Sequence, residues 1–223
     1  MLEILRQYFY KRFKTSFSKS GEDIQLWQLL KKEKGTYIDI GGHHPKIGNN
    51  SYFFYLRGWR GLIVEPNPFF KNLYHQIRPK DHLFQGGVAD FDGNMKYYIQ
   101  QSNLLNTFSE QYLIENNLLE STTEIRDVPV RKLSSLLEDV NLAGKEIDFM
   151  SIDVEGLEFE VASGNNWEKS RPKYLLFESS NALEFDMESN LTLYLKEREY
   201  QLVGKSLLSQ KVGTIWFRAN EVK

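Results

Sequence analysis

The sequence predicts an α/β fold built on a mostly parallel sheet with helices on both faces. Short runs that are apolar at nearly every position alternate with longer stretches of helical spacing, a pattern typical of strands buried on both sides. The chain has 223 residues, 41% hydrophobic and 14% aromatic, which suits one domain with a sizeable core. The last two runs, 200–208 and 213–220, predict a closing antiparallel pair.

The predicted helices follow the spacing of apolar residues. Residues 22–33 carry Ile24, Trp27 and Leu30 at helical intervals and begin with two acids, as helix starts commonly do. Further helices are predicted over 50–57, 69–78, 132–140, 155–163 and 188–198.

The predicted strands are short and bounded by turn residues. Pro66 and Pro68 end one of them, and the turn at Asp92–Gly93 starts another. The predicted strands are 35–40, 61–68, 82–90, 91–100, 146–154, 172–179, 200–208 and 213–220. Residues 101–126 are polar with scattered Leu, Phe and Tyr, and we expect this insertion to form a lid over the acceptor.

Composition excludes several classes of protein. A net charge of −2 and a pI of about 6.1 give no reason to expect nucleic-acid binding. The absence of cysteine excludes disulfides, thiolate metal sites and cysteine nucleophiles, and it fits a reducing compartment. No apolar run is long enough to span a bilayer, and no secretory signal is evident. We therefore expect a cytoplasmic protein.

The first 20 residues form a basic amphipathic segment ahead of a single domain at 21–223. Large apolar residues such as Phe9 and Phe13 alternate there with Lys11 and Arg12. Such a segment either covers the domain as a helix or makes peripheral contact with an anionic membrane surface. Both interpretations stay open.

Acidic residues gather at the ends of the predicted strands. In a doubly wound sheet, functional residues lie at the carboxyl ends of strands. The acids found at or just after these ends are Asp39, Glu65, Asp90, Asp153 and Glu178.

The stretch "YIDIGGHHPKIGNNS" at 37–51 predicts a ligand that carries no phosphate. Neither G-x-G-x-x-G nor G-x-x-x-x-G-K-[ST] occurs, which disfavours phosphate binding. His43 and His44 face opposite ways on an extended chain, which disfavours a shared zinc ion. Gly41 and Gly42 allow a sharp turn beside a ligand, and an acid such as Glu65 commonly accepts from ribose hydroxyls. S-adenosylmethionine, a nucleoside without phosphate, fits this combination.

Several unlike motifs, in order, resemble one known family. They are "SGEDIQLWQLL", "DIGGHHPKIGNNSYFFYLRGWRGLIVEPNP", "DVPVRKLSSLLED" and "FMSIDVEGLEFEVASG". Over about residues 18–182, the chain resembles the FkbM family of S-adenosylmethionine-dependent methyltransferases. The resemblance implies a Rossmann-like class I methyltransferase fold, with a seven-stranded sheet and an antiparallel last strand, and O-methylation of sugars or natural products. One departure is Gly42-His43-His44, where family members often have alanine and then histidine–aspartate.

The resemblance also implies roles for single residues. By this resemblance, the methionine tail and the sulfonium are bordered by Asp39, Gly41 and Gly42. The ribose hydroxyls bind to Glu65, and the wall beside them is shaped by Pro66 and Asn67. The adenine lies near Ala89 and Asp90, and the methyl group is transferred near Asp153. Taken singly, several of these residues also have plainer interpretations as a strand end, a helix cap or part of a hairpin turn.

A hydroxyl acceptor must lose its proton as it attacks the methyl group, so we expect a base. Glu155 and His43 are equal candidates, because two nearby carboxylates raise one pKa and a histidine titrates near neutrality. Asp153 is the third candidate, favoured for positioning the acceptor. The oxygen ligands Asp153, Glu155 and Glu178 also suit Mg²⁺, but the sequence does not require a metal.

The sequence thus predicts an S-adenosylmethionine-dependent O-methyltransferase acting on a sugar or glycan hydroxyl, as in a bacterial surface polysaccharide, a glycoconjugate or its precursor. The substrate assignment follows the family resemblance alone, since function depends on the site rather than the fold. Two alternatives are an NAD-dependent oxidoreductase and a non-catalytic relative that binds a glycan or a partner protein.

Overall fold

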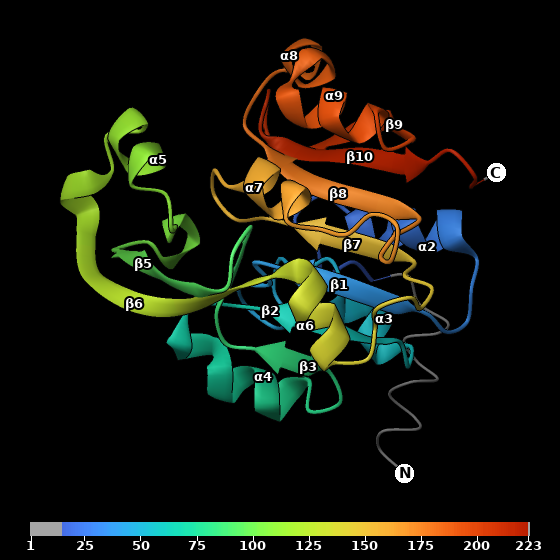
Figure 1. Cartoon of the computed structure of the whole chain (residues 1–223), viewed down its shortest axis with the longest axis horizontal. Helices are drawn as coiled ribbons and strands as arrows, with labels where there is room; N and C mark the ends of the chain where they lie inside the picture. Colours follow the sequence, from blue (N-terminus) through green and yellow to red (C-terminus); the bar gives the residue numbers. More distant parts are fainter. Residues whose placement is uncertain (1–14, 223) are drawn as a thin grey trace.

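A seven-stranded sheet lies at the centre of the protein, in the order β3-β2-β1-β7-β8-β10-β9. The computed structural model describes residues 15–222 (Figure 1). Most of the amphipathic segment predicted at 1–20 therefore lies outside the described residues. No helix among residues 15–222 is long and apolar enough to cross a membrane.

The strands of the central sheet are parallel except for the last one in sequence. They are β1 (Thr36–Ile40), β2 (Arg60–Val64), β3 (His82–Phe84), β7 (Phe149–Ile152), β8 (Tyr174–Ser179), β9 (Tyr200–Leu207) and β10 (Gly213–Ala219). Strand β10 pairs antiparallel with both β8 and β9, and the pairs among β3, β2, β1, β7 and β8 are parallel. The predicted fold class, including the antiparallel last strand, is confirmed.

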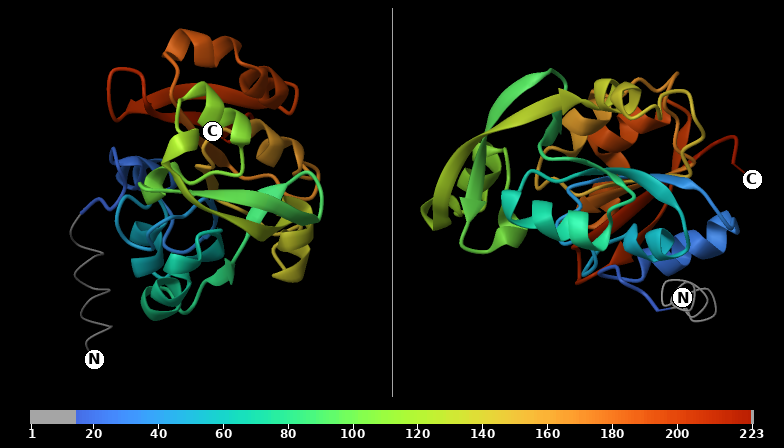
Figure 2. Two further views of the ribbon diagram at one scale, coloured as in Figure 1. Left: turned by 90° about the vertical axis from the view of Figure 1, so that its left-hand side faces the viewer. Right: turned by 90° about the horizontal axis from the view of Figure 1, so that it is seen from below.

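Helices cover both faces of the central sheet (Figure 2). One layer holds α2 (Glu22–Leu30), α3 (Tyr52–Leu56) and α4 (Lys71–Ile77), and the other holds α6 (Leu133–Asp139), α7 (Glu158–Ser163) and α9 (Asn190–Lys196), with α8 (Leu183–Glu188) just before α9. Because successive strand residues point to opposite faces, β1 directs Tyr37 into an aromatic cluster with the first layer and Ile38 and Ile40 into an aliphatic cluster with the second.

A second sheet of three strands, in the order β4-β6-β5, lies beyond the carboxyl ends of the parallel strands (Figure 1). Its strands are β4 (Gly87–Ala89), β5 (Gly93–Gln100) and β6 (Thr122–Lys132), and β5 and β6 are joined through the short helices η2 (Asn103–Leu105), α5 (Glu110–Glu115) and η3 (Leu119–Ser121). We call residues 93–132 the arm. It contains the segment 101–126 predicted as an insertion, whose last residues form part of β6.

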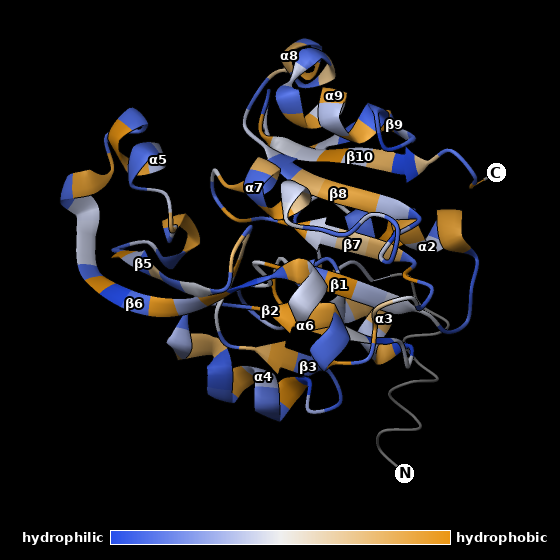
Figure 3. Ribbon diagram, viewed as in Figure 1, coloured by the Kyte–Doolittle hydropathy of each residue, from blue (hydrophilic) through white to orange (hydrophobic). Residues whose placement is uncertain are grey.

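The structure differs from the prediction in three elements. The single strand predicted at 82–90 is wrong, because the chain leaves the central sheet after Phe84 and enters the second sheet at Gly87. Strand β6 was not predicted, since only Val128 and Val130 along it are buried. Figure 3 shows hydrophilic and hydrophobic residues mixed along this strand. The helix predicted at 155–163 begins at Glu158, because Glu155 has a positive φ of 52°.

Candidate functional site

A cavity of about 570 Å³ opens where the carboxyl ends of β1, β2 and β7 meet the arm. Carboxyl ends of parallel strands meet at one edge of a sheet, so side chains from distant parts of the sequence converge there. The predicted site residues that line this cavity are Asp39, Gly41, Gly42, His43, Glu65, Pro66, Asp153 and Glu155. From the arm, the whole stretch 103–108 contributes to its wall.

The double glycine after β1 lets two strand ends approach each other closely. Gly41 has a φ of 76°, a conformation that side chains other than glycine rarely adopt. A Cβ at Gly41 would lie 1.7 Å from the backbone oxygen of Asp153, and one at Gly42 would lie 2.4 Å from the hydroxyl of Tyr74. Gly41 therefore requires glycine and brings the loop after β1 against the loop after β7, whereas Gly42 makes room for the side chain of Tyr74 from α4.

Glu65 follows β2 and presents a buried carboxylate to the cavity. One oxygen accepts a hydrogen bond from the backbone N–H of His43 at 2.6 Å, and the other accepts from the backbone N–H of Asn67 at 2.7 Å. Burial raises the pKa of Glu65 to about 7, although these two donors favour the charged form. Two carboxylate oxygens offer about four acceptor positions, so capacity remains for hydroxyl groups of a ligand.

Asp39 lies beneath the loop in a buried polar network. It accepts hydrogen bonds from Asn49 at 3.1 Å and from the hydroxyl of Ser51. Arg78, itself buried, donates to Asn49 at 3.0 Å and to Ser51 at 2.9 Å. Burial raises the pKa of Asp39, and the positive charge of Arg78 opposes that shift. Sequence reasoning missed these partners, for which "NNS" after the glycines was the only signal.

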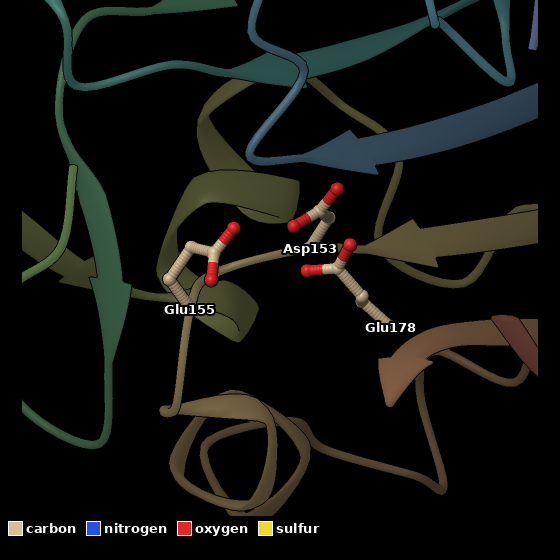
Figure 4. A group of neighbouring side chains, drawn as sticks. All are labelled: Asp153, Glu155 and Glu178. Atoms are coloured by element: carbon tan, nitrogen blue, oxygen red, sulfur yellow. The ribbon is translucent and has the colours of Figure 1, made fainter. Parts of the chain in front are cut away.

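Three carboxylates, Asp153, Glu155 and Glu178, form what we call the acidic cluster. One oxygen from each lies within 4.8 Å of the others, and Figure 4 shows the three groups pointing toward one another. Burial and then the charge of Asp153 raise the pKa values of Glu155 and Glu178. The hydroxyl of Tyr112, from the arm, donates to Glu155 at 2.7 Å.

Lys19 supplies a positive charge to the acidic cluster. Its ammonium lies 3.1 Å from Asp153 and 3.2 Å from Glu178. Burial opposes the charged form, but the two carboxylates prevail and raise the pKa of Lys19. Asp23 holds the preceding turn by accepting from the backbone N–H of Phe17 at 2.7 Å. From the sequence, Lys19 is one of the basic residues of the segment 1–20 and nothing more, because its partners are more than a hundred residues away.

The two adjacent histidines have different surroundings. The Nε2 atom of His43 lies 3.1 Å from the side-chain oxygen of Asn103 in the arm, and its ring packs against Phe70. Burial lowers the pKa of His43, which favours the neutral imidazole at pH 7. In contrast, the Nδ1 atom of His44 accepts from the backbone N–H groups of Lys46 and Ile47 and shapes the turn.

Three residues predicted to hold the cofactor do not line the cavity. The side chain of Asn67 accepts from the backbone N–H of Phe69 at 3.0 Å and caps a short helix. Ala89 is buried and Asp90 is exposed, and neither residue lines the cavity. Because β4 belongs to the second sheet, Gly87 and Val88 line the cavity in their place.

Comparison with solved structures finds distant similarities. A 1,6-didemethyltoxoflavin-N1-methyltransferase from Burkholderia thailandensis, with bound 1,6-didemethyltoxoflavin and S-adenosylhomocysteine, is 9% identical, with 91% of this chain and 78% of that chain covered and a TM-score of 0.46. Aeropyrum pernix fibrillarin with bound S-adenosyl-L-methionine is 11% identical, with 90% and 74% covered and a TM-score of 0.45. A precorrin-6y C5,15-methyltransferase from Geobacter metallireducens is 9% identical, with 88% and 86% covered and a TM-score of 0.45.

Comparison with protein sequences and families gives a clearer result. No curated protein matches the chain. A family model described as the methyltransferase FkbM domain matches residues 39–202. The match covers well over half of the chain and includes the strand ends that line the cavity. The chain therefore belongs to the FkbM family of S-adenosylmethionine-dependent methyltransferases.

Proposed function

We propose that the protein methylates a hydroxyl group of a sugar or glycan, with Glu155 as the base. The acidic cluster carries this proposal, because it brings a carboxylate of raised pKa to the edge of the cavity that suits the cofactor. Such a carboxylate is a stronger base than an ordinary one and is still partly ionised near neutral pH. The sugar as acceptor follows the family resemblance.

The cavity fits S-adenosylmethionine in size and chemistry. Its volume of about 570 Å³ lies in the usual range for small-molecule sites. Glu65 would accept from the ribose hydroxyls, and the bend at Gly41 and Gly42 would leave room for the methionine tail beside Asp39. When bound, the cofactor supplies a methyl group on a cationic sulfonium, whose sulfur leaves as a neutral group and needs no acid.

Glu155 is better placed than His43 to take the proton of the acceptor. It belongs to the acidic cluster, whereas His43 packs against Phe70 and lies within reach of Asn103. Asp153 and Lys19 form an ion pair beside Glu155, which suits them to hold the acceptor and the base in position. A positioned base contributes a factor of about 10² to 10⁴ to the rate, and alignment of the reacting atoms contributes further.

The acidic cluster also has the ligand set for Mg²⁺. A divalent ion bound there would have to displace the ammonium of Lys19 from Asp153 and Glu178. We therefore propose a reaction in which Lys19 balances the charge of the cluster.

The arm is suited to act as the lid expected at 101–126. Residues 103–108 line the cavity, and Thr107 donates a hydrogen bond to the backbone oxygen of Glu155 at 2.8 Å. Movement of this segment would open the cavity for exchange of the cofactor and product.

Two measurements test the proposed function. S-adenosylhomocysteine should raise the melting temperature of the protein, and NAD should not, because a ligand stabilises only the folded state that binds it. Glu65→Ala should weaken S-adenosylhomocysteine binding by about 10- to 100-fold while the fold is kept, since charged hydrogen bonds contribute about 1.5–3 kcal/mol. Unchanged affinity would remove Glu65 from the ribose role.

A coupled assay tests catalysis itself. The protein, S-adenosylmethionine and pooled sugar acceptors should release S-adenosylhomocysteine. Tight cofactor binding without release on any acceptor would favour a non-catalytic binding relative, and stabilisation by NAD alone would favour an oxidoreductase.

A further inference from the structure

A second cavity, of about 380 Å³, lies on the other side of the acidic cluster. It is bounded by the start of α7, the end of β8 and the segment around α8. Glu155 lines both cavities, whereas Asp153 lines only the first and Glu178 only the second. The acidic cluster is therefore the partition between the two spaces.

We propose that the second cavity receives the methyl acceptor, and that this acceptor is a neutral or amino-bearing sugar rather than an acidic one. This inference rests on the proposed function and adds the class of substrate to it. Methyl transfer is an in-line displacement, so the attacking oxygen must approach the methyl group from the side opposite to the sulfur. The two cavities adjoin at Glu155, so an acceptor in the second cavity can direct a hydroxyl toward the methyl group at this junction, with the carboxylate of Glu155 beside the attacking oxygen.

The charges around the second cavity disfavour an anionic acceptor. Neither lysine nor arginine is among its lining residues. The five acids that line it are Glu155, Glu158, Glu160, Glu178 and Asp186. Lys205 lies 2.7 Å from Asp186, and Lys19 lies 3.2 Å from Glu178, so these two acids are paired. Glu155, Glu158 and Glu160 have no such ion pair among the described residues. Burial raises the pKa values of Glu155 and Glu158 to about 7, so a carboxylate or phosphate on the acceptor would meet the exposed Glu160 and the ionised fraction of the other two as like charges.

The remaining lining suits a molecule rich in hydroxyl groups. Neutral hydrogen-bonding side chains come from Ser180, Asn181 and Asn190, all of them exposed. Phe159 is 40% exposed and packs edge-on against Tyr194, so its ring offers an apolar surface on one side. A flat ring beside several donors and acceptors, with acids near it, can hold the apolar face, the hydroxyl groups and any ammonium of a sugar.

Binding of three sugars of one ring type tests the charge preference. Glucosamine, glucose and glucuronate are added to the full chain saturated with S-adenosylhomocysteine, and dissociation constants are measured by ligand-observed NMR. We expect glucosamine and glucose to bind at least about tenfold more tightly than glucuronate, the effect of one unfavourable like-charge contact near a surface. Glucuronate binding as tightly as glucosamine, or no binding of any of the three sugars, would overturn the inference.

Two charge-reversal variants locate the preference. Glu160→Lys should reduce the ratio of glucuronate to glucosamine dissociation constants several-fold. Glu168→Lys makes the same change at an exposed glutamate that lines neither cavity and should leave the ratio unchanged. Equal effects of the two variants would place the sugar elsewhere.

The two proposals fail in different ways. If the proposed function is wrong, the protein will not bind S-adenosylhomocysteine or will show no turnover with any acceptor. If only this inference is wrong, the cofactor will bind normally, and the dissociation constants of the three sugars will not depend on their charge. Phe159→Ala should weaken the binding of all three sugars alike without changing the affinity for S-adenosylhomocysteine. Unchanged sugar affinity would exclude the second cavity as the acceptor site.

Discussion

The central sheet and the arm meet at the same cavity but are built differently. Every residue of β7 is buried, whereas most of β6 is exposed. The sheet contributes strand-end acids such as Glu65 and Asp153, and the arm contributes residues 103–108 to the cavity wall and Tyr112 to the acidic cluster. Side chains packed on all sides have fixed positions, while a segment with few buried contacts opens at lower free energy. The sheet is thus suited to bind and align, and the arm to cover and adjust.

The largest effect should come from the sheet side, at Gly41. Gly41→Ala places a Cβ against the backbone of Asp153, and we expect a loss of about 3 kcal/mol or more in the free energy of unfolding. Gly144→Ala is the matched control, because Gly144 has a similar φ of 73° with nothing within 4 Å. It should lose only about 1–2 kcal/mol, the strain of the backbone alone. Urea unfolding measures both, and equal losses would contradict the close approach.

The next effect concerns turnover. Glu155→Gln should lower kcat by about 10² to 10⁴ while S-adenosylhomocysteine affinity changes little, because Gln keeps the shape of the side chain but cannot take a proton. His43→Gln should lower kcat much less. Steady-state kinetics and calorimetry separate the two effects, and the reverse order of the two variants would make His43 the base.

A pH effect should follow from Glu65. Its pKa is raised to about 7 in the folded state by burial, so the folded protein holds a proton that the unfolded chain releases above about pH 4.5. The free energy of unfolding should therefore fall as pH rises from about 4.5 to 7, by up to about 3 kcal/mol from this group. Urea unfolding at pH 5 and pH 8 should show a smaller difference in Glu65→Gln. If Glu65→Gln keeps the full wild-type difference in the free energy of unfolding between pH 5 and pH 8, Glu65 is not the source of the pH dependence.

The smallest effect should come from the arm. Tyr112→Phe removes the hydroxyl that donates to Glu155, a bond that lowers the pKa of Glu155 against the effect of burial. Without it the pKa rises further, less base is ionised at pH 7, and kcat should fall about 3- to 10-fold, as for one lost hydrogen bond. Activity should recover as pH increases. A loss that is uniform across the pH range would indicate disturbed packing of the arm.

The sequence was informative where burial is complete and poor where it is partial. Strands such as β1 and β7 were predicted because buried strands are apolar on nearly every residue, and Glu65 and Asp153 were expected together because parallel strands end on one edge. Strand β6 has only two buried apolar residues, so it lacked a clear pattern. The sequence also did not predict the split between β3 and β4. One continuous strand over 82–90 would have brought Ala89 and Asp90 to the cavity, but in the structure they belong to the second sheet and the turn after it.

By itself, the sequence determined the fold class, the family and the edge of the sheet that carries the site, because hydrophobic periodicity and local motifs are properties of neighbouring residues. Only the tertiary structure decided that Lys19 pairs with Asp153 and Glu178, that Tyr112 donates to Glu155 and that a second cavity lies behind the cluster. These features depend on contacts between residues far apart in the chain, and such contacts exist only after the sheet, the helices and the arm have packed together.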